Sequence, residues 1–279
     1  MPMGFPAAGF ESGLRYVAEP GDVFVCTYPK CGTTWMQYIV YLLLHDGRPL
    51  APGAPLDLAF PHLEEVGREV VAALARPRLI KTHLTRALTP FAAGARYIYV
   101  ARNPFDCVVS FYHHTRGFPQ HYDFANGTFA DFFECFVSGE VDFGDYFEHL
   151  LSWSALVDAP NVFFVTYEDM QADAHAVIVA VARFLGEKAE SAARNEAVLA
   201  SILDAVSFKR MAEDQRRWSS ARPKDQPPFV RKGAVGDWQT SMTPSQARRL
   251  LAAFDERTVG TFAAQLWPEI IAAVRRYSS

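Results

Sequence analysis

The chain has 279 residues, of which 27 are Lys or Arg and 31 are Asp or Glu, so its formal net charge is −4 at pH 7. Half of the residues are hydrophobic and 14% are aromatic, which suffices for a sizeable core and excludes a disordered or collagen-like chain. The slight acidic excess disfavours a general nucleic-acid binder, but it is compatible with a local basic pocket for one phosphorylated ligand. We expect a single domain over residues 1–279.

Neither a membrane span nor a signal peptide is predicted. The most apolar stretch, Ile39–Leu44, is flanked by Gln37 and His45 and is shorter than the roughly 18 residues that a span needs. Residues 1–10 lack the charged region of a signal peptide. The four cysteines are Cys26, Cys31, Cys107 and Cys135. None forms a C-x-x-C pair and no Cys/His set has zinc spacing, so we expect a reduced, cytoplasmic protein.

Short apolar runs alternate with longer helical patterns along the chain. The runs, rich in Val, Ile, Phe or Tyr, predict buried strands at Val23–Thr27, Leu79–Lys81, Tyr97–Val100 and Val162–Val165. The helical patterns cover Thr33–His45, Pro104–Arg116, Glu168–Leu185 and Pro244–Phe254, the last capped by Thr243. This alternation predicts an α/β fold with a central parallel sheet flanked by helices.

The segment Thr27–Trp35 (T-Y-P-K-C-G-T-T-W) runs from the first strand into the first helix and predicts an anion-binding loop. Pro29 and Gly32 bend the chain, so that backbone N–H groups at the helix start can face an anion. Lys30 adds a full charge, and the two threonines add hydroxyl donors. The loop is P-loop-like only, because in the Walker pattern the Lys follows the Gly. Such turns are also common on surfaces, but the terminal Trp offers a stacking face for a base.

This loop resembles the phosphosulfate-binding loop of the cytosolic sulfotransferases, which transfer a sulfuryl group from 3′-phosphoadenosine 5′-phosphosulfate (PAPS) to an alcohol, phenol or amine. Four further segments resemble motifs of that family in the same order: Lys81–Leu84, Tyr99–His113, Tyr167–Met170 and Arg231–Trp238. The last carries the pattern R-K-G-x-x-G-D-W, whose charged, glycine and aromatic positions make the match specific. The matches together span most of the chain.

The resemblance implies a donor site for PAPS, and for its product adenosine 3′,5′-bisphosphate (PAP), with three parts. The phosphosulfate is expected over Lys30, Cys31, Gly32, Thr33 and Thr34. The 3′-phosphate is expected against Arg102, Ser110, Arg231, Lys232 and Gly233. Adenine is expected near Trp35, Tyr167, Ser207 and Phe208. Arg suits this task because its forked donors match phosphate oxygens, and Gly lets the backbone approach.

The same resemblance implies the catalytic roles. His83 is the expected general base, since a neutral imidazole can take a hydroxyl proton at physiological pH. Lys81 would hold the sulfuryl oxygens or the site geometry, and Lys30 would neutralise charge on the departing bridging oxygen. Ser110 would compete for Lys30 before the acceptor arrives. We expect in-line transfer through a loose transition state, driven by positioning and electrostatics and independent of any metal ion.

The acceptor pocket is the least predictable part. Its candidate residues are Phe24, His62, Phe111 and His113. Because the segment before Asp22 is short, we expect the pocket to be open on that side. The expected partner is a small molecule with a hydroxyl group, rather than a nucleic acid or a membrane.

Two departures from the family pattern concern reactivity and assembly. Cys31 stands where the family has Ser, and its place beside Lys30 at a helix N-terminus predicts a lowered thiol pKa and easy oxidation or alkylation. The alternative is that Cys31 supplies only its backbone N–H. Residues 257–266 keep a basic residue and a Thr of the family's dimer motif but lack its Val and Glu, so the oligomeric state stays open.

Two other functions compete with sulfuryl transfer. A P-loop small-molecule kinase would share the strand, loop and helix, but it predicts a Gly-Lys-[Ser/Thr] order and a metal-binding Asp, and neither is found. A non-catalytic nucleotide-binding module would keep the donor contacts and lose the base. The presence of His83, Lys81 and Lys30 argues against such a module.

Overall fold

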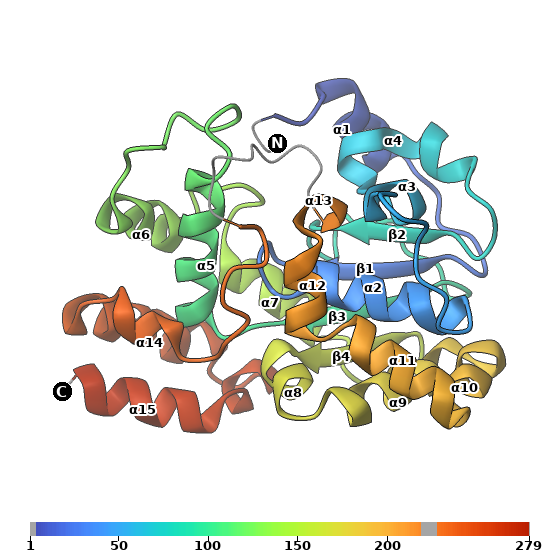
Figure 1. Ribbon diagram of the computed structural model, residues 1–279. Coiled ribbons are helices and arrows are strands. Elements are labelled where there is room, and N and C mark those ends of the chain that lie inside the picture. Colours follow the sequence, from blue (N-terminus) through green and yellow to red (C-terminus); the bar gives the residue numbers. More distant parts are fainter. Residues whose placement is uncertain (1–3, 219–227, 279) are drawn as a thin grey trace.

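Four parallel strands lie at the centre of the fold (Figure 1). They are β1 (Val23–Thr27), β2 (Leu79–Thr82), β3 (Arg96–Ala101) and β4 (Val162–Thr166), arranged in the order β2-β1-β3-β4. The computed structural model describes residues 4–218 and 228–278 of the chain. The predicted parallel α/β fold is confirmed, and three of the four strands are only slightly longer than the sequence pattern indicated.

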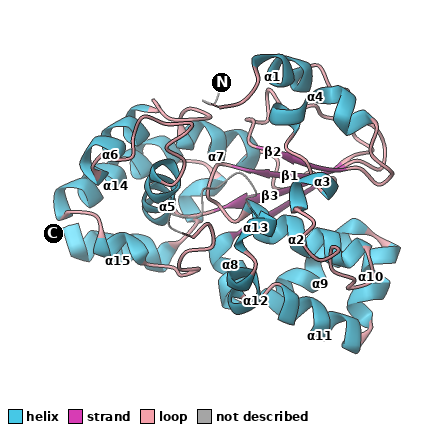
Figure 2. Cartoon of the chain, turned by 45° about the horizontal axis from the view of Figure 1, so that its top comes forward, coloured by secondary structure: helices cyan, strands magenta, loops and turns pink. Residues whose placement is uncertain are grey.

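Helices cover both faces of the sheet (Figure 2). One face packs against α2 (Thr33–Leu44), α9 (Ala174–Leu185), α10 (Glu187–Arg194) and α11 (Glu196–Ala205). The other packs against α5 (Pro104–Arg116), α6 (Phe129–Ser138), α7 (Tyr146–Ser154), α14 (Pro244–Thr258) and α15 (Pro268–Ser278). The remaining elements are α1 (Ala7–Leu14), α3 (Leu56–Ala59), α4 (Leu63–Ala72), α8 (Tyr167–Ala172), α12 (Phe208–Glu213), α13 (Gln215–Trp218) and the 3₁₀ helices η1 (Asp237–Thr240) and η2 (Phe262–Gln265). Within the described ranges, no helix combines the length and apolarity needed to cross a bilayer.

Successive strand residues enter opposite cores, as the two-residue period of a strand requires. In β1, Phe24 joins the core beneath α5 and α7, whereas Val25 joins the core beneath α2 and α9. In β3, Tyr97 and Ile98 divide in the same way. Both faces are therefore buried, which explains why the strands are apolar throughout.

The strand order determines where a ligand can bind. β1 lies between β2 and β3 in the sheet, so the connection that follows β1 and the connection that follows β2 lead to opposite sides of β1. A crevice forms at the carboxyl ends of the strands where the strand order reverses in this way. Cys26 pairs in register with Thr82, and Thr27 pairs with Val100. The segments that follow the four strands, each with a predicted functional motif, therefore meet at one edge of the sheet.

One predicted helix is in fact two. The pattern over Glu168–Leu185 predicted a continuous helix, but α8 ends at Ala172 and α9 begins at Ala174. Asp173 between them has φ −150° and ψ 81°, and its side chain accepts a hydrogen bond from the Ala176 N–H as an N-cap. An Asp at this position stabilises the start of a new helix, because it satisfies a backbone donor that has no partner within that helix.

Phe24 lies in the core rather than in an acceptor pocket. Its side chain is fully buried, and its ring stacks on Tyr97 with centroids 4.9 Å apart. The prediction that Phe24 faces the acceptor is therefore corrected: this aromatic residue, inside a buried strand, serves packing.

We expect Phe24→Ala to lower the free energy of unfolding by about 3–5 kcal/mol, because it leaves a cavity beside Tyr97. Urea denaturation followed by circular dichroism measures this change. Val259→Ala is the control, since that side chain is 75% exposed and its loss should change stability little. Equal effects of the two substitutions would contradict the account of the core.

Candidate active site

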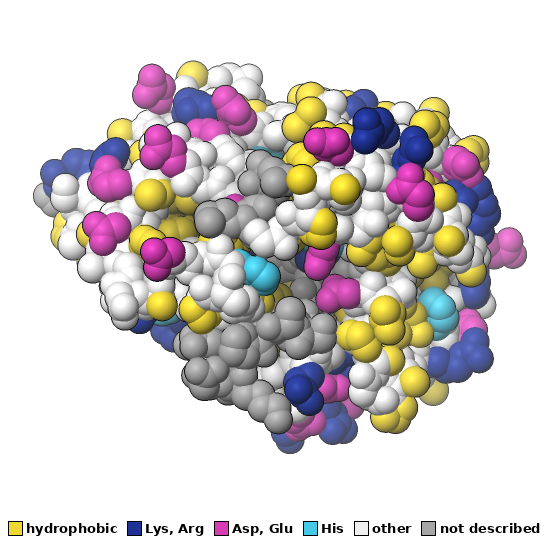
Figure 3. Space-filling view, turned by 90° about the horizontal axis from the view of Figure 1, so that it is seen from above, with side chains coloured by type: hydrophobic (Ala, Val, Ile, Leu, Met, Phe, Trp, Pro, Cys, Tyr) yellow, Lys and Arg dark blue, Asp and Glu magenta, His cyan; other side chains and the backbone are white. Residues whose placement is uncertain are grey.

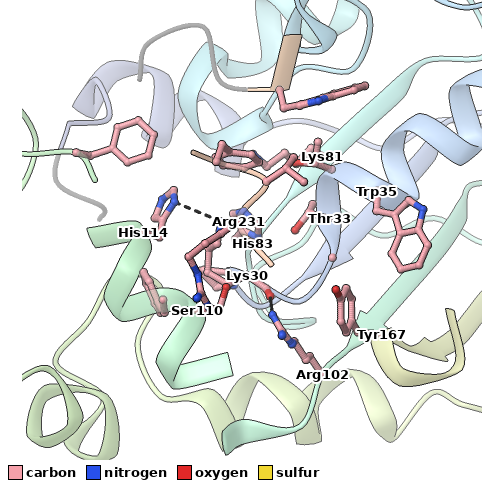
Figure 4. A pocket seen from close by; sticks show the side chains of 18 of the residues that line it. Lys30, Thr33, Trp35, Lys81, His83, Arg102, Ser110, His114, Tyr167 and Arg231 are labelled. Carbon is pink, nitrogen blue, oxygen red and sulfur yellow. Dashed lines mark hydrogen bonds between the residues drawn. The ribbon is translucent and has the colours of Figure 1, made fainter. Parts of the chain in front are cut away.

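A cavity of about 440 Å³ lies at the carboxyl ends of the strands (Figure 4). It brings together sixteen of the residues singled out from the sequence: Lys30, Gly32, Thr33, Thr34, Trp35, His62, Lys81, His83, Arg102, Ser110, Phe111, Tyr167, Phe208, Arg231, Lys232 and Gly233. Trp35 and Tyr167 lie on one side and His114 on the other, with Lys30 and His83 between them (Figure 4). The cavity therefore has an aromatic end and a histidine-containing end, joined at the loop after β1.

The loop after β1 is built to present backbone donors. Gly32 has φ +95° and begins α2, and no side chain caps that helix. A Cβ atom at Gly32 would lie 2.9 Å from the Tyr167 ring, so both the backbone angle and the close approach favour glycine. Lys30 also has positive φ, +69°, which is uncommon for a residue with a side chain and typical of strained functional loops. The uncapped N–H groups of α2 thus face the cavity where an anion is favoured.

Lys30 has partners that the sequence did not reveal. Its Nζ lies 3.3 Å from Nδ1 of His114 and 4.2 Å from the centroid of the Phe229 ring. Because an ammonium group can only donate, Nδ1 of His114 is the acceptor. Both partners come from distant segments, α5 and the loop before Arg231, so only the folded chain shows the contact.

Hydrogen bonds join the two segments predicted to bind the 3′-phosphate, the one at the start of α5 and the one over residues 231–238. The Asp106 carboxylate on α5 accepts hydrogen bonds from the Gly236 N–H at 2.8 Å and the Trp238 N–H at 3.0 Å. Arg102 donates to the Ala234 carbonyl at 3.2 Å, and its guanidinium lies 4.4 Å from the centroid of Tyr167. The segments after β3 and before η1 therefore form one rigid wall.

Arg231 and Lys232 both pair with the carboxylate of Asp237. Burial raises the pKa of Asp237, but the hydrogen bonds from Lys232 and Arg231 outweigh burial and lower this pKa to about 2. Asp237 is therefore ionised at neutral pH and holds two cationic side chains at the cavity. Asp237 thus fixes the Arg-Lys pair at the cavity wall, in contrast to a charge pair that is free in solvent.

The aromatic end can receive a flat base. The rings of Trp35 and Tyr167 meet edge to face with centroids 5.7 Å apart, and Gln171 donates to the Tyr167 hydroxyl at 2.9 Å. Phe208 is 45% exposed and lies against Gly233. Sequence reasoning missed further lining residues here because they belong to no recognised motif: Gln171, Met211, Trp218, Phe229 and Val230.

Ser207 does not line the cavity, in contrast to its predicted role at the adenine. Its hydroxyl accepts a hydrogen bond from the Arg210 N–H at 3.3 Å and caps α12. We therefore interpret Ser207 as positioning Phe208, the next residue, through the start of that helix.

His83 follows β2 and is almost fully buried. Its Nδ1 lies 2.8 Å from the Thr27 carbonyl oxygen, and since a carbonyl oxygen carries no proton, Nδ1 must be the donor. Nε2 is then the unprotonated nitrogen. The pKa of His83 is well below its ordinary value because burial disfavours the charged form, with further lowering by His62 and Lys81. A neutral imidazole therefore has its basic nitrogen available.

The backbone of His83 is held from both sides. The Glu64 carboxylate accepts hydrogen bonds from the His83 N–H at 2.7 Å and from the Thr82 hydroxyl at 2.9 Å. Nε2 of His149 lies 3.1 Å from the His83 carbonyl and donates to it, while the Tyr99 hydroxyl lies 3.0 Å from Nδ1 of His149. Sequence reasoning missed Glu64 and His149, whose contacts depend on packing between α4, α7 and the strands.

Cys31 is buried and does not behave as predicted. Burial raises the pKa of its thiol well above the ordinary value, so the expected lowering by Lys30 and the helix N-terminus is overturned. Its Sγ points into the core, 3.8 Å from Sγ of Cys107, and it does not line the cavity. The alternative interpretation, that Cys31 offers only its backbone to the donor loop, agrees with this position.

At the histidine-containing end of the cavity, which we call the acceptor end because the acceptor is expected there, the segment before α1 contributes to the wall on the side that we expected to be open. Phe5, from the segment before α1, lines the cavity, and its ring lies 4.8 Å from that of His62. His113 instead faces a small adjoining recess shared with Ser110 and Arg231. Residues of α3, α4 and α5 and of the loops around α6 complete this end: Asp57, Glu65, His114, Phe118, His121, Tyr122, Asp142 and Phe143.

Comparisons with known proteins agree with this site. Residues 20–262 match the family model described as Sulfotransferase domain. Human sulfotransferase 1C2 is 34% identical over 261 residues, which cover 88% of this chain and 86% of that protein. Mouse sulfotransferase 1A1 is 32% identical over 278 residues, which cover 93% of each chain. The chain therefore belongs to the sulfotransferase family.

Two solved structures share the fold of this chain. Mouse sulfotransferase SULT7A1 complexed with PAP matches with a TM-score of 0.74 and 27% identity, over 96% of this chain and 92% of that one. Retinol dehydratase, in a structure with androsterone and inactive cofactor PAP, shares the fold with a TM-score of 0.81 at 23% identity. The predicted class, a PAPS-dependent sulfotransferase, is confirmed.

We expect Gly233→Ala to weaken PAP binding about tenfold. Gly233 has φ +59°, and a Cβ atom there would lie 2.3 Å from the Phe208 ring, so the ring must move. Isothermal titration calorimetry with PAP measures the affinity. Gly236→Ala is the matched control, because Gly236 also has positive φ, +90°, but a Cβ atom there meets nothing within 4 Å. Equal losses in the two variants would assign the effect to backbone strain rather than to Phe208.

Proposed function

We propose that this enzyme transfers the sulfuryl group of PAPS to the hydroxyl group of a small molecule, with His83 as the general base. The observation that carries the proposal is the Nδ1 contact of His83 with the Thr27 carbonyl, which leaves Nε2 basic beside the anion-binding loop. A basic nitrogen and an anion loop in one cavity suit group transfer to a hydroxyl better than binding alone.

Donor binding would use three features of the cavity. The uncapped N–H groups at the start of α2 and Lys30 would bind the phosphosulfate. Arg102, Arg231 and Lys232 would bind the 3′-phosphate, supported by Asp106 and Asp237 behind them. The adenine would lie against the aromatic end. This assignment is supported by the related mouse SULT7A1, whose structure is a complex with PAP.

The transfer would be a single displacement at sulfur. Nε2 of His83 accepts the proton of the acceptor hydroxyl while the hydroxyl oxygen forms a bond to sulfur. The bond from sulfur to the bridging oxygen breaks, and PAP leaves with that oxygen and its electron pair. Lys30 would stabilise the charge that grows on the bridging oxygen, and Lys81 would stabilise the equatorial sulfuryl oxygens.

Ser110 lines the cavity one turn before His114 on α5, and Lys30 interacts with His114. We propose that Lys30 exchanges between the α5 side and the donor, so that it reaches the bridging oxygen once PAPS is bound. The competition of Ser110 for Lys30 stays a prediction.

We expect His83→Ala to lower the rate of transfer from ³⁵S-labelled PAPS to a panel of phenols and alcohols at least 100-fold, because the base is lost. PAP binding should be retained, since donor contacts come from other residues. His175→Ala on α9 is the matched control, because His175 is exposed and does not line the cavity. Transfer that survives in His83→Ala would remove His83 from its role; donor binding without turnover of any acceptor in the wild type would favour a binding module.

We propose that catalysis needs no metal ion, because lysine side chains and backbone donors supply the positive charge at the reacting group. In residues 4–218 and 228–278, no group of three His, Cys, Asp or Glu side chains is arranged to hold a metal ion. We therefore expect the same transfer rate with and without EDTA. A Mg²⁺-dependent kinase is the control, because it should lose its activity in the buffer that contains EDTA. A strict Mg²⁺ requirement would contradict this and would favour the kinase alternative.

Cytoplasmic location and a single domain over residues 1–279 stay predictions.

A further inference from the structure

We infer that the hydroxyl acceptor carries a protonated amine, which the acidic side chains at the acceptor end of the cavity recognise. This inference rests on the proposed function and adds the chemical class of the acceptor. It depends on three properties of this end: carboxylates that make no hydrogen bond or ion pair within the described residues, aromatic surfaces, and a buried polar side chain in the wall.

Carboxylates from three separate segments line this end of the cavity. Asp57 lies on α3, Glu65 on α4, and Asp142 in the loop before α7. In the described part of the chain, no hydrogen bond or ion pair involves the side chain of Asp57 or of Glu65. Asp142, by contrast, accepts a hydrogen bond from the Tyr122 hydroxyl. The first two carboxylates are therefore available to a ligand.

The surroundings of Asp57 and Glu65 disfavour their ionised forms. Burial raises the pKa of each, and Lys81 only partly opposes that effect. The negative charge of the Asp57 carboxylate raises the pKa of Glu65 further, because two like charges repel each other. A cation placed between them would stabilise both ionised forms.

Repulsion from the other charges in the cavity also favours a cationic acceptor. The donor would bring its phosphates to Lys30, Arg102, Arg231 and Lys232, while Lys81, which also lines the cavity, only partly offsets the charge of Asp57 and Glu65. An anionic acceptor would be repelled both by the donor's phosphates and by the carboxylates, and a neutral acceptor would leave the carboxylates uncompensated. The face seen from above also carries acidic side chains in its middle as well as at its edge (Figure 3).

Aromatic rings give this end a surface for the rest of the acceptor. Phe5, Phe118 and Phe143 line it, and the Phe143 ring lies 5.1 Å from the His83 ring. These rings can pack against the hydrocarbon or aromatic part of an acceptor whose hydroxyl reaches His83. They can also contact an ammonium group through their faces.

His62 adds a buried polar group at the same end. It is 3% exposed, and its Nε2 and the Glu64 Oε2 atom 3.5 Å away have no hydrogen-bond partner among the described residues. Buried polar atoms are usually satisfied, and of these two residues His62 lines the cavity, so its imidazole gives this wall a polar group that suits a polar ligand better than a wholly apolar one. The sequence analysis predicted His62 as an acceptor-pocket residue, and the structure places it in the cavity wall.

The test compares two phenols that differ only in charge. Tyramine and 4-propylphenol have nearly the same shape, with an ammonium group in the first where the second has a methyl group. We expect the wild type to prefer tyramine in kcat/KM for transfer from ³⁵S-labelled PAPS. The ratio of the two kcat/KM values should fall about tenfold in Asp57→Asn and in Glu65→Gln, which corresponds to about 1.4 kcal/mol of lost discrimination each.

Both kcat/KM values are measured on the same preparation of each variant. A smaller fraction of folded enzyme lowers both values equally and therefore does not change their ratio. Glu256→Gln is the matched control, because Glu256 is exposed on α14 and does not line the cavity; its ratio should equal that of the wild type. A wild-type preference for 4-propylphenol, or a ratio unchanged in both variants, would overturn the inference and leave the proposed function standing. Transfer to neither phenol nor to any alcohol tested, with PAP still bound, would overturn both.

Discussion

The hydrogen bond from Nδ1 of His83 to the Thr27 carbonyl is the contact on which the rest of the site depends. It joins the end of β2 to the end of β1, just before the anion-binding loop, and thereby fixes the imidazole relative to that loop. It also selects the tautomer, because the carbonyl can only accept. Glu64 and His149 hold the backbone of His83 from opposite sides, so the orientation of Nε2 is set by packing before any ligand arrives.

A second constraint is the pairing of segments far apart in sequence. Asp106 at the start of α5 binds the backbone of Gly236 and Trp238, so the wall behind the proposed 3′-phosphate site exists without ligand. The cost of holding Arg231 and Lys232 near each other is offset by the ionised Asp237. Preorganised cations and backbone donors need little rearrangement when charge develops, so this wall suits the sulfuryl transfer that we propose.

Much of the fold and the donor end could be predicted from sequence, because strand periodicity and the motifs after each strand are local signals. The pattern over Val23–Thr27 predicted β1, and the loop after it entered the cavity as expected. The predictions for Phe24 and Cys31 were wrong because burial, which is a property of the whole fold, outweighed the local features of strand end and helix start. The acceptor end was predicted only in part: His62 and Phe111 line the cavity as expected, whereas Phe5, Asp57 and Asp142 come from segments without a motif, which only the folded chain brings together.

The most direct test of the central claim is the protonation state of His83 in the folded enzyme. A two-bond ¹H–¹⁵N correlation spectrum of ¹⁵N-labelled protein, assigned with His83→Ala, distinguishes the two ring nitrogens. We expect a protonated Nδ1 and an unprotonated Nε2 at pH 7 and still at pH 6, because burial holds the pKa of His83 well below its ordinary value near 6.5. An Nε2–H tautomer, or an imidazolium at pH 7, would contradict it.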